Sequence, residues 1–184
     1  MKGKLLIQNG RVLPMTGKVI PKGSVLVENG KITAVAERIE VPDTGSTEII
    51  DASGCLVMPG LIEAHCHVGI TEEKKGMEGD DCNENVSPVT PWLRAIDAVN
   101  TMDAAFDDAV RAGITSIMAG PGSSNVVGGQ FAFIKTKGRR IDDLIVKAPA
   151  AMKIAFGENP KVNFSGQEKS PVTRMAIAGI LREE

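Results

Sequence analysis

The sequence predicts an α/β fold that begins with a small β-rich segment. Three observations lead to this prediction. Short apolar runs separated by Asn-Gly pairs precede residue 58, Pro59-Gly60 interrupts the pattern, and apolar runs then alternate with helical patterns. We therefore divide the chain into residues 1–58 and residues 59–184. With 184 residues, of which 42% are hydrophobic, the chain can form one domain or two small ones.

In the first segment, the pairs Asn9-Gly10 and Asn29-Gly30 predict β-hairpins, because both residue types tolerate the positive φ of a type I′ turn. The strands expected around these turns cover residues 5–7, 12–13, 24–27 and 32–35. A polar turn at residues 42–46 is then followed by two more expected strands, at residues 48–51 and 55–58.

From residue 61 the pattern changes to strand, loop, helix and strand, which is typical of parallel βα units. The expected order is a strand at 61–68, a polar surface loop at 69–90, a helix at 103–112, strands at 114–119 and 131–135, a short helix or extended piece at 142–147, a strand at 151–156 and a helix over 172–181. The helix at 103–112 has an apolar face, Thr101 or Asp103 can cap its start, and Gly113 follows its end.

Composition argues against several classes of protein. The formal charge is −2 and the basic residues are scattered among carboxylates, so no basic face for nucleic acid is expected. The N-terminus lacks the pattern of a secretion signal, and no apolar run approaches the roughly 20 residues that span a bilayer. Three cysteines without a CxxC pair indicate neither a disulfide framework nor a structural zinc site. We therefore expect a cytoplasmic protein with no membrane partner.

The only two histidines, His65 and His67, stand one residue apart at the end of an apolar run. In an extended strand, side chains at positions i and i+2 project to the same side, so both imidazoles can reach one cation, and Cys66 must point elsewhere. Neutral imidazole suits zinc, iron or manganese. The alternative interpretation is a pair of surface imidazoles on an edge strand.

The run Pro59-Gly60-Leu61-Ile62-Glu63-Ala64-His65-Cys66-His67, placed after Asn-Gly pairs, resembles the metal-dependent amidohydrolase superfamily, particularly its imidazolonepropionase-like members. The resemblance implies a partial (β/α)₈ TIM-type barrel, of which this chain holds about the first four strands. It also implies that residues 1–58 form a β-sandwich segment. The implied activity is hydrolysis of an amide or related C–N bond in a small-molecule substrate. The implied cofactor is a divalent metal, with zinc as first choice and iron or manganese as alternatives.

The resemblance also assigns residues to a metal site. His65 and His67 become ligands at the end of the first barrel strand, with Glu63 two residues deeper as a support for them. Lys153 lies in a run similar to the fourth barrel strand, where a lysine carbamate bridges two metals; the alternative is a lysine that extends to solvent. Glu158 is the competing oxygen ligand, or a loop carboxylate with no role.

The glycine-rich stretch at residues 120–129 matches neither GxxxxGK nor a GxGxxG motif that opens a helix. We expect it to form a turn at the barrel mouth, where Ser123, Ser124 and Asn125 can donate hydrogen bonds to a substrate. A solvated loop is the alternative.

A complete barrel takes about 250 residues, and roughly half of that number follows residue 58. The further ligands that the resemblance implies, histidines after strands five and six and an aspartate after strand eight, have no counterpart here, and no catalytic residue is identified. We therefore expect this chain alone to be inactive. Three hypotheses remain: a metallohydrolase portion completed by a complementary C-terminal chain, a non-enzymatic truncated remnant that self-associates, and a small-ligand binding module that uses residues 120–129.

Overall fold

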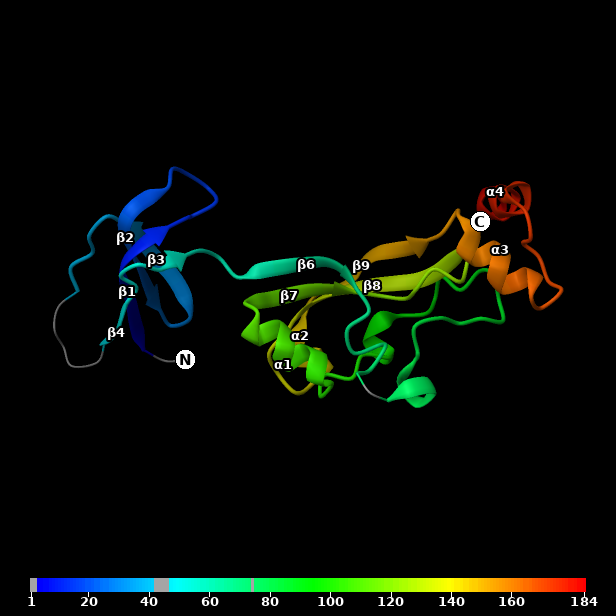
Figure 1. Ribbon diagram of the computed structural model, residues 1–184, viewed down its shortest axis with the longest axis horizontal. Helices are drawn as coiled ribbons and strands as arrows, with labels where there is room; N and C mark the ends of the chain where they lie inside the picture. Colours follow the sequence, from blue (N-terminus) through cyan, green and yellow to red (C-terminus); the bar gives the residue numbers. More distant parts are fainter. Residues whose placement is uncertain (1–2, 42–46, 74) are drawn as a thin grey trace. The chain divides into compact units, whose positions relative to one another are not determined.

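The computed structural model describes residues 3–41, 47–73 and 75–184, and the chain divides into two units, Met1–Pro59 and Gly60–Glu184 (Figure 1). The polar turn expected at residues 42–46 lies outside the described residues. Each unit contains its own sheet, so each is described separately. In the part of the chain that the structure describes, no helix is long and apolar enough to cross a membrane.

The first unit is built on a sheet in the order β3-β2-β1-β4, with β5 also paired to β1. Its strands are β1 (Lys4–Val12), β2 (Ile20–Glu28), β3 (Lys31–Ala36), β4 (Thr47–Asp51) and β5 (Leu56–Val57). The pairs β1/β2 and β2/β3 are antiparallel, whereas β4 and β5 run parallel to β1. The described residues thus give one sheet of the expected β-rich segment.

The two Asn-Gly pairs have different roles in this sheet. The hairpin at Asn29-Gly30 is confirmed: φ is 52° and 78° at these residues, and they join β2 to β3. The hairpin at Asn9-Gly10 is wrong, because β1 continues through it with a register shift against β2 between Ile7 and Gly10. Asn9 takes φ 65° there, and its Nδ2 donates to Asp51 Oδ1 at 3.0 Å. The same residue types that favour a tight turn also suit a β-bulge inside a strand.

The second unit contains a sheet in the order β6-β7-β8-β9, whose strands lie side by side in Figure 1. Its strands are β6 (Leu61–Cys66), β7 (Ile114–Ala119), β8 (Val127–Lys135) and β9 (Ile145–Ile154). β6 and β7 are parallel, but β7/β8 and β8/β9 are antiparallel. The expected succession of parallel βα units is therefore wrong after β7. Residues 120–126 and the short helix α2 (Ile141–Leu144) are too short for crossovers, which take a dozen or more residues.

The helices of this unit follow local sequence signals. α1 (Ala104–Arg111) begins after Asp103, whose side chain accepts from the backbone N–H of Ala105, and Gly113 follows it with φ 81°. This confirms the predicted helix and one of its two candidate caps. α4 (Arg174–Glu183) is capped in the same way by Thr173, near the start of the helix expected over 172–181. α3 (Glu158–Ser165) lies between the strand expected at 151–156 and the helix expected over 172–181, where no helix was predicted. Short 3₁₀ turns at Gly76–Gly79 and Ala95–Asp97 lie in the long connection between β6 and α1.

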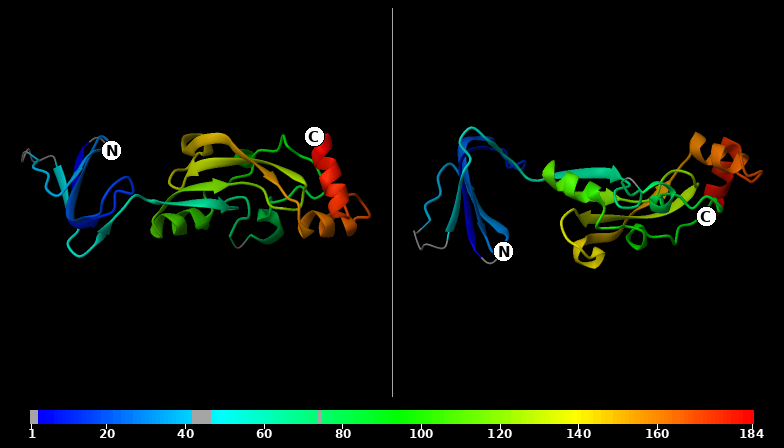
Figure 2. Two further views of the ribbon diagram at one scale, coloured as in Figure 1. Left: turned by 90° about the horizontal axis from the view of Figure 1, so that it is seen from above. Right: turned by 60° about the horizontal axis from the view of Figure 1, so that its bottom comes forward.

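One face of the second sheet is covered by the main core of the unit. Phe106 of α1 and Leu144 of α2 pack there with small and branched residues of the two central strands, which are Ile117, Ala119, Ala132 and Ile134. Another buried cluster joins Val126 and Val127 to Ile177 of α4. Both views in Figure 2 place α1 and α2 near one end of the sheet and α3 and α4 near the other.

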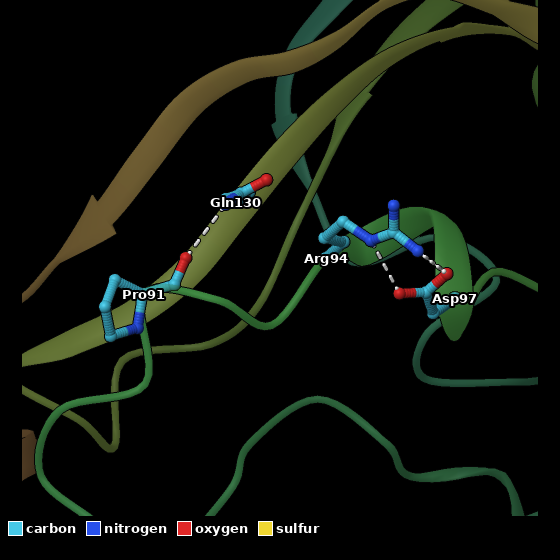
Figure 3. Close-up of polar contacts among 4 residues, drawn as sticks. All are labelled: Pro91, Arg94, Asp97 and Gln130. Carbon is cyan, nitrogen blue, oxygen red and sulfur yellow. Dashed lines mark hydrogen bonds and ion pairs between the residues drawn. The ribbon is translucent and has the colours of Figure 1, made fainter.

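A segment at residues 88–97, which ends in the 3₁₀ turn at Ala95–Asp97, lies along the start of β8, beyond the point where β7 has ended. The backbone N–H of Thr90 donates to the carbonyl of Val127 at 2.8 Å, and that of Gln130 donates to the carbonyl of Leu93 at 2.8 Å. Figure 3 shows the Gln130 side chain donating to the carbonyl of Pro91, at 3.0 Å. The 88–97 segment therefore extends the sheet in place of β7.

Candidate metal centre

His65 and His67 lie at the carboxyl end of β6, on the same side of the chain. Their ring centroids are 5.5 Å apart and the ring planes meet at 86°. Cys66 packs against the core instead, with its thiol 3.6 Å from the carbonyl oxygen of Met118, and burial raises its pKa. The alternation expected from an extended strand is confirmed: the two imidazoles project to one side of the strand, and the thiol of Cys66 projects to the other.

A backbone carbonyl fixes the orientation of His67. Nδ1 of its half-buried ring lies 2.7 Å from the carbonyl oxygen of Gly120, which directly follows β7. Since a carbonyl oxygen can only accept, Nδ1 carries a proton, and in the neutral ring the lone pair therefore lies on Nε2. Ligating histidines in proteins are commonly held by this kind of contact at the other ring nitrogen. The contact with Gly120 thus fixes the direction in which Nε2 of His67 points.

Lys153 lies close to the histidines, although it belongs to β9, at the opposite edge of the second sheet from β6. Its Nζ lies 3.5 Å from Nε2 of His65, although 88 positions separate the two residues in the sequence. Partial desolvation lowers the pKa of His65, electrostatic repulsion from Lys153 and then from His67 lowers it further, and Glu63 opposes them. These surroundings therefore favour the neutral form of the His65 ring, which is the form that binds metal ions.

Glu63 contacts the backbone of the histidine pair. Its Oε1 accepts a hydrogen bond of 2.9 Å from the backbone N–H of His65. Within the described residues, no group of three or more His, Cys, Asp and Glu side chains is placed to hold a metal ion. The arrangement that the structure does bring together is two imidazoles and one amine.

Glu158 is placed at the first position of α3 and is engaged elsewhere. Both of its carboxylate oxygens accept from Nζ of Lys161, at 3.0 and 2.8 Å, and this contact lowers the pKa of Glu158. The ion pair follows the i, i+3 spacing of neighbouring side chains on a helix. The contacts of Glu158 therefore belong to α3.

Residues of the glycine-rich stretch form hydrogen bonds with residues 83–87 of the same unit. Asn125 is fully buried, and its Nδ2 donates to the carbonyls of Glu84 and Ser87. The backbone N–H of Ser124 donates to Asn83 Oδ1 at 3.0 Å, and Ser123 is half-buried beside it. The amide nitrogen of Asn125 thus has a structural role, since it anchors the loop to residues 84–87.

A cavity of about 390 Å³ borders this region. It is lined by residues 80–84, by residues 93–95 and 97 of the 88–97 segment and residue 98 directly after it, and by Ile70, Pro121 and Gly128. A Cβ at Gly128 would lie 3.2 Å from Cγ of Lys153, so the stem of Lys153 adjoins the cavity wall. On its rim, Arg94 forms two hydrogen bonds of 2.9 Å with Asp97, as Figure 3 shows. The cavity lining thus includes Gly128, a neighbour of Lys153, but none of His65, His67 and Lys153 themselves.

Two contributors to the site were not predicted from the sequence. The carbonyl of Gly120 has no signature, because every residue carries such an acceptor. Phe131 lies on β8 with its ring centroid 5.2 Å from that of His65, and in the sequence it cannot be distinguished from an ordinary core residue. His65 and His67 were found from spacing, whereas Lys153 was found through the family resemblance.

Several known proteins are similar to most of this chain. No family model matches the sequence. The amidohydrolase tasK of Hapsidospora irregularis is 34% identical over 80% of this chain, and a dihydroorotase of Elusimicrobium minutum is 28% identical over 98% of it. The crystal structure of an amidohydrolase from Thermotoga maritima MSB8 superposes with a TM-score of 0.91 at 43% identity over 97% of this chain.

These relatives are considerably longer than the region they share with this chain. The matched region covers 16% of the H. irregularis protein, 44% of the dihydroorotase and 46% of the T. maritima chain. This chain therefore spans less than half of each of them.

Proposed function

Because this chain belongs to the amidohydrolase superfamily, we propose that its second unit supplies part of a metal-dependent hydrolase centre acting on an amide or related C–N bond. The observation that carries the proposal is the convergence of His65, His67 and Lys153 from β6 and β9. The bond class is supported by relatives named as amidohydrolase and dihydroorotase.

The donor set fits a divalent ion in part. His65 and His67 would hold the ion, since the Gly120 carbonyl leaves Nε2 of His67 free and the surroundings of His65 favour its neutral form. Zinc, with iron or manganese as alternatives, acts as a Lewis acid toward the scissile group and toward water when it is bound. A free lysine amine is a poor ligand beside two imidazoles. Carboxylation of Lys153 would join its nitrogen to the carbon of CO₂ with loss of one proton, and would supply oxygen donors.

Other residues have smaller parts in this proposal. Glu158 is the alternative oxygen donor, and it would have to leave Lys161 to serve. Ser123 and Ser124 remain candidates for contact with a substrate in the adjoining cavity. For the whole protein, we propose that residues 59–184 contribute the first strands of a barrel, that residues 1–58 contribute a β-sandwich segment, and that a complementary C-terminal chain completes the site.

The direct test is metal binding by the purified chain. We expect zinc to bind with saturable heat in calorimetry, and His65→Ala or His67→Ala to weaken it by more than about 100-fold. Lys153→Met tests the third group, and Lys147→Met, an exposed lysine on the same strand, is the matched control. Wild-type protein that binds no zinc, or both histidine variants that bind it normally, would refute the metal centre.

A second experiment tests the carbamate and the activity. Protein incubated with carbon-13 bicarbonate should show a carbamate carbonyl resonance that disappears in Lys153→Met and persists in Lys147→Met. Mixed with the portion of the T. maritima amidohydrolase that it does not match, the chain should gain zinc-dependent hydrolysis of dihydroorotate or another cyclic amide. A well-folded complex with bound zinc and no hydrolysis of any amide would contradict the proposed reaction class.

A further inference from the structure

Phe131, on the central strand β8, packs against the ring of His65. Its side chain is 5% exposed, and its ring is tilted by 58° against the ring of His65 at a centroid distance of 5.2 Å. Two rings in this arrangement attract each other, and a buried aromatic side chain has few alternative rotamers. Phe131 therefore restricts the direction in which the His65 ring can lie.

The same ring also packs on the peptide that holds His67. At Gly120, an added Cβ would lie only 2.3 Å from Cγ and Cδ1 of Phe131, so the backbone approaches this ring as closely as only glycine allows. The carbonyl of Gly120 accepts from Nδ1 of His67 at 2.7 Å. Displacement of Phe131 would release this peptide and, with it, the contact that sets the tautomer of His67.

We propose that Phe131 is the positioning residue for both imidazoles of the metal centre. It acts directly on the ring of His65 and, through the Gly120 peptide, on His67. The inference rests on the proposed function, because it assigns to Phe131 the prior alignment of two metal ligands. Prior alignment raises affinity, since ordering of the ligands does not then oppose binding.

The test compares Phe131→Leu with two leucine controls. Phe133→Leu changes a partly buried residue two positions along the same strand, and Phe106→Leu changes a residue of the core on α1. We expect Phe131→Leu to weaken zinc binding by about 10-fold or more, the size typical of lost supporting contacts. Both controls should bind zinc as the wild type does, although Phe106→Leu also loses stability.

Nuclear magnetic resonance of the metal-free protein supplies a readout that general destabilisation does not move. The chain has two histidines, so each imidazole gives its own signals. In Phe131→Leu, the His65 signals should lose the ring-current shift of Phe131, and the His67 ring should show mixed tautomers; both should be unchanged in Phe106→Leu. If Phe131→Leu does not fold, Gly120→Ala disturbs the same contact from the opposite side and should have the same effects.

The outcomes separate this inference from the proposed function. Wild-type zinc binding that is retained in Phe131→Leu, with both imidazole spectra unchanged, overturns the role of Phe131 and leaves the metal centre intact. Absence of zinc binding in the wild type overturns both. Equal weakening in Phe131→Leu and Phe106→Leu, without a change in tautomer, shows a merely structural role and also overturns the inference.

Discussion

At the scale of single residues, the two histidines and Lys153 were accessible to sequence reasoning in different degrees. The i, i+2 spacing predicts the common direction of His65 and His67 from strand geometry alone. Lys153 lies 88 positions from His65, and no local pattern connects them. The Gly120 carbonyl and the ring of Phe131 were missed, because backbone acceptors and buried aromatics carry no signal of function in a sequence.

The surroundings of His65 predict an unusual titration. Partial desolvation, Lys153 and His67 together lower its pKa in the folded state below the ordinary value of about 6.5. The unfolded chain therefore binds this proton more tightly than the folded chain. The resulting stabilisation is fully present above about pH 6.5 and is lost as the pH falls through the lowered folded value.

This titration can be followed by the imidazole signals in nuclear magnetic resonance. We expect the His65 signal to have its midpoint below 6.5, with His65→Ala used to assign it. In Lys153→Met the midpoint should rise, because one source of positive charge is gone, whereas Lys147→Met should leave it in place. A His65 midpoint at or above 6.5 in the wild type would contradict the described surroundings.

At the scale of elements, local sequence signals predicted which helices and strands form better than they predicted how these elements are connected and paired. The helix after Asp103, the strand β7 and the hairpin at Asn29-Gly30 all follow from propensity, capping and turn chemistry. The direction of β8 and β9 does not, because apolar runs look alike in parallel and antiparallel strands. Connection length was a partial signal, because the expected strands at 114–119 and 131–135 leave eleven residues between them. In the structure β8 begins earlier and seven residues remain, which is too few for a helical crossover.

The contact between the 88–97 segment and β8 predicts a sensitive position at Gly129. Its φ of 125° is unfavourable for other residues, and a Cβ there would lie 2.7 Å from the carbonyl oxygen of Leu93. We expect Gly129→Ala to lower the free energy of unfolding by about 1–3 kcal/mol in urea denaturation. Gly179→Ala, in open space on α4, should instead raise it by roughly 0.5–1 kcal/mol. Equal stability of the two variants would show that the close approach is not maintained.

At the scale of the whole molecule, the second sheet exposes apolar side chains on its edge strands. In the described residues, β6 and β9 are the edges of this sheet, and Ile62 on β6 and Val146 on β9 are largely exposed. Unpaired edges with apolar side chains favour pairing with another chain. The surface thus agrees with either a complementary chain or self-association as its partner, and the sequence alone could not choose between them.

Self-association is checked by light scattering coupled to gel filtration. Without the complementary C-terminal chain, we expect the apparent mass of the wild type to increase with concentration, since the apolar edge strands of different copies associate. Ile62→Lys combined with Val146→Lys should restore the monomer by placing charge on both edges. Val162→Lys, an exposed position on α3, is the matched control and should associate as the wild type does. A wild type that stays monomeric at all concentrations would refute self-association through the edges.

The 88–97 segment determines where the intrinsic fluorescence of this chain originates. It contains Trp92, the single tryptophan of a chain that has no tyrosine. The Trp92 side chain is 66% exposed and adjoins Leu93, which lines the cavity beside Lys153. Intrinsic fluorescence of the chain therefore originates at one known place, so its emission can report events near the cavity without any attached label.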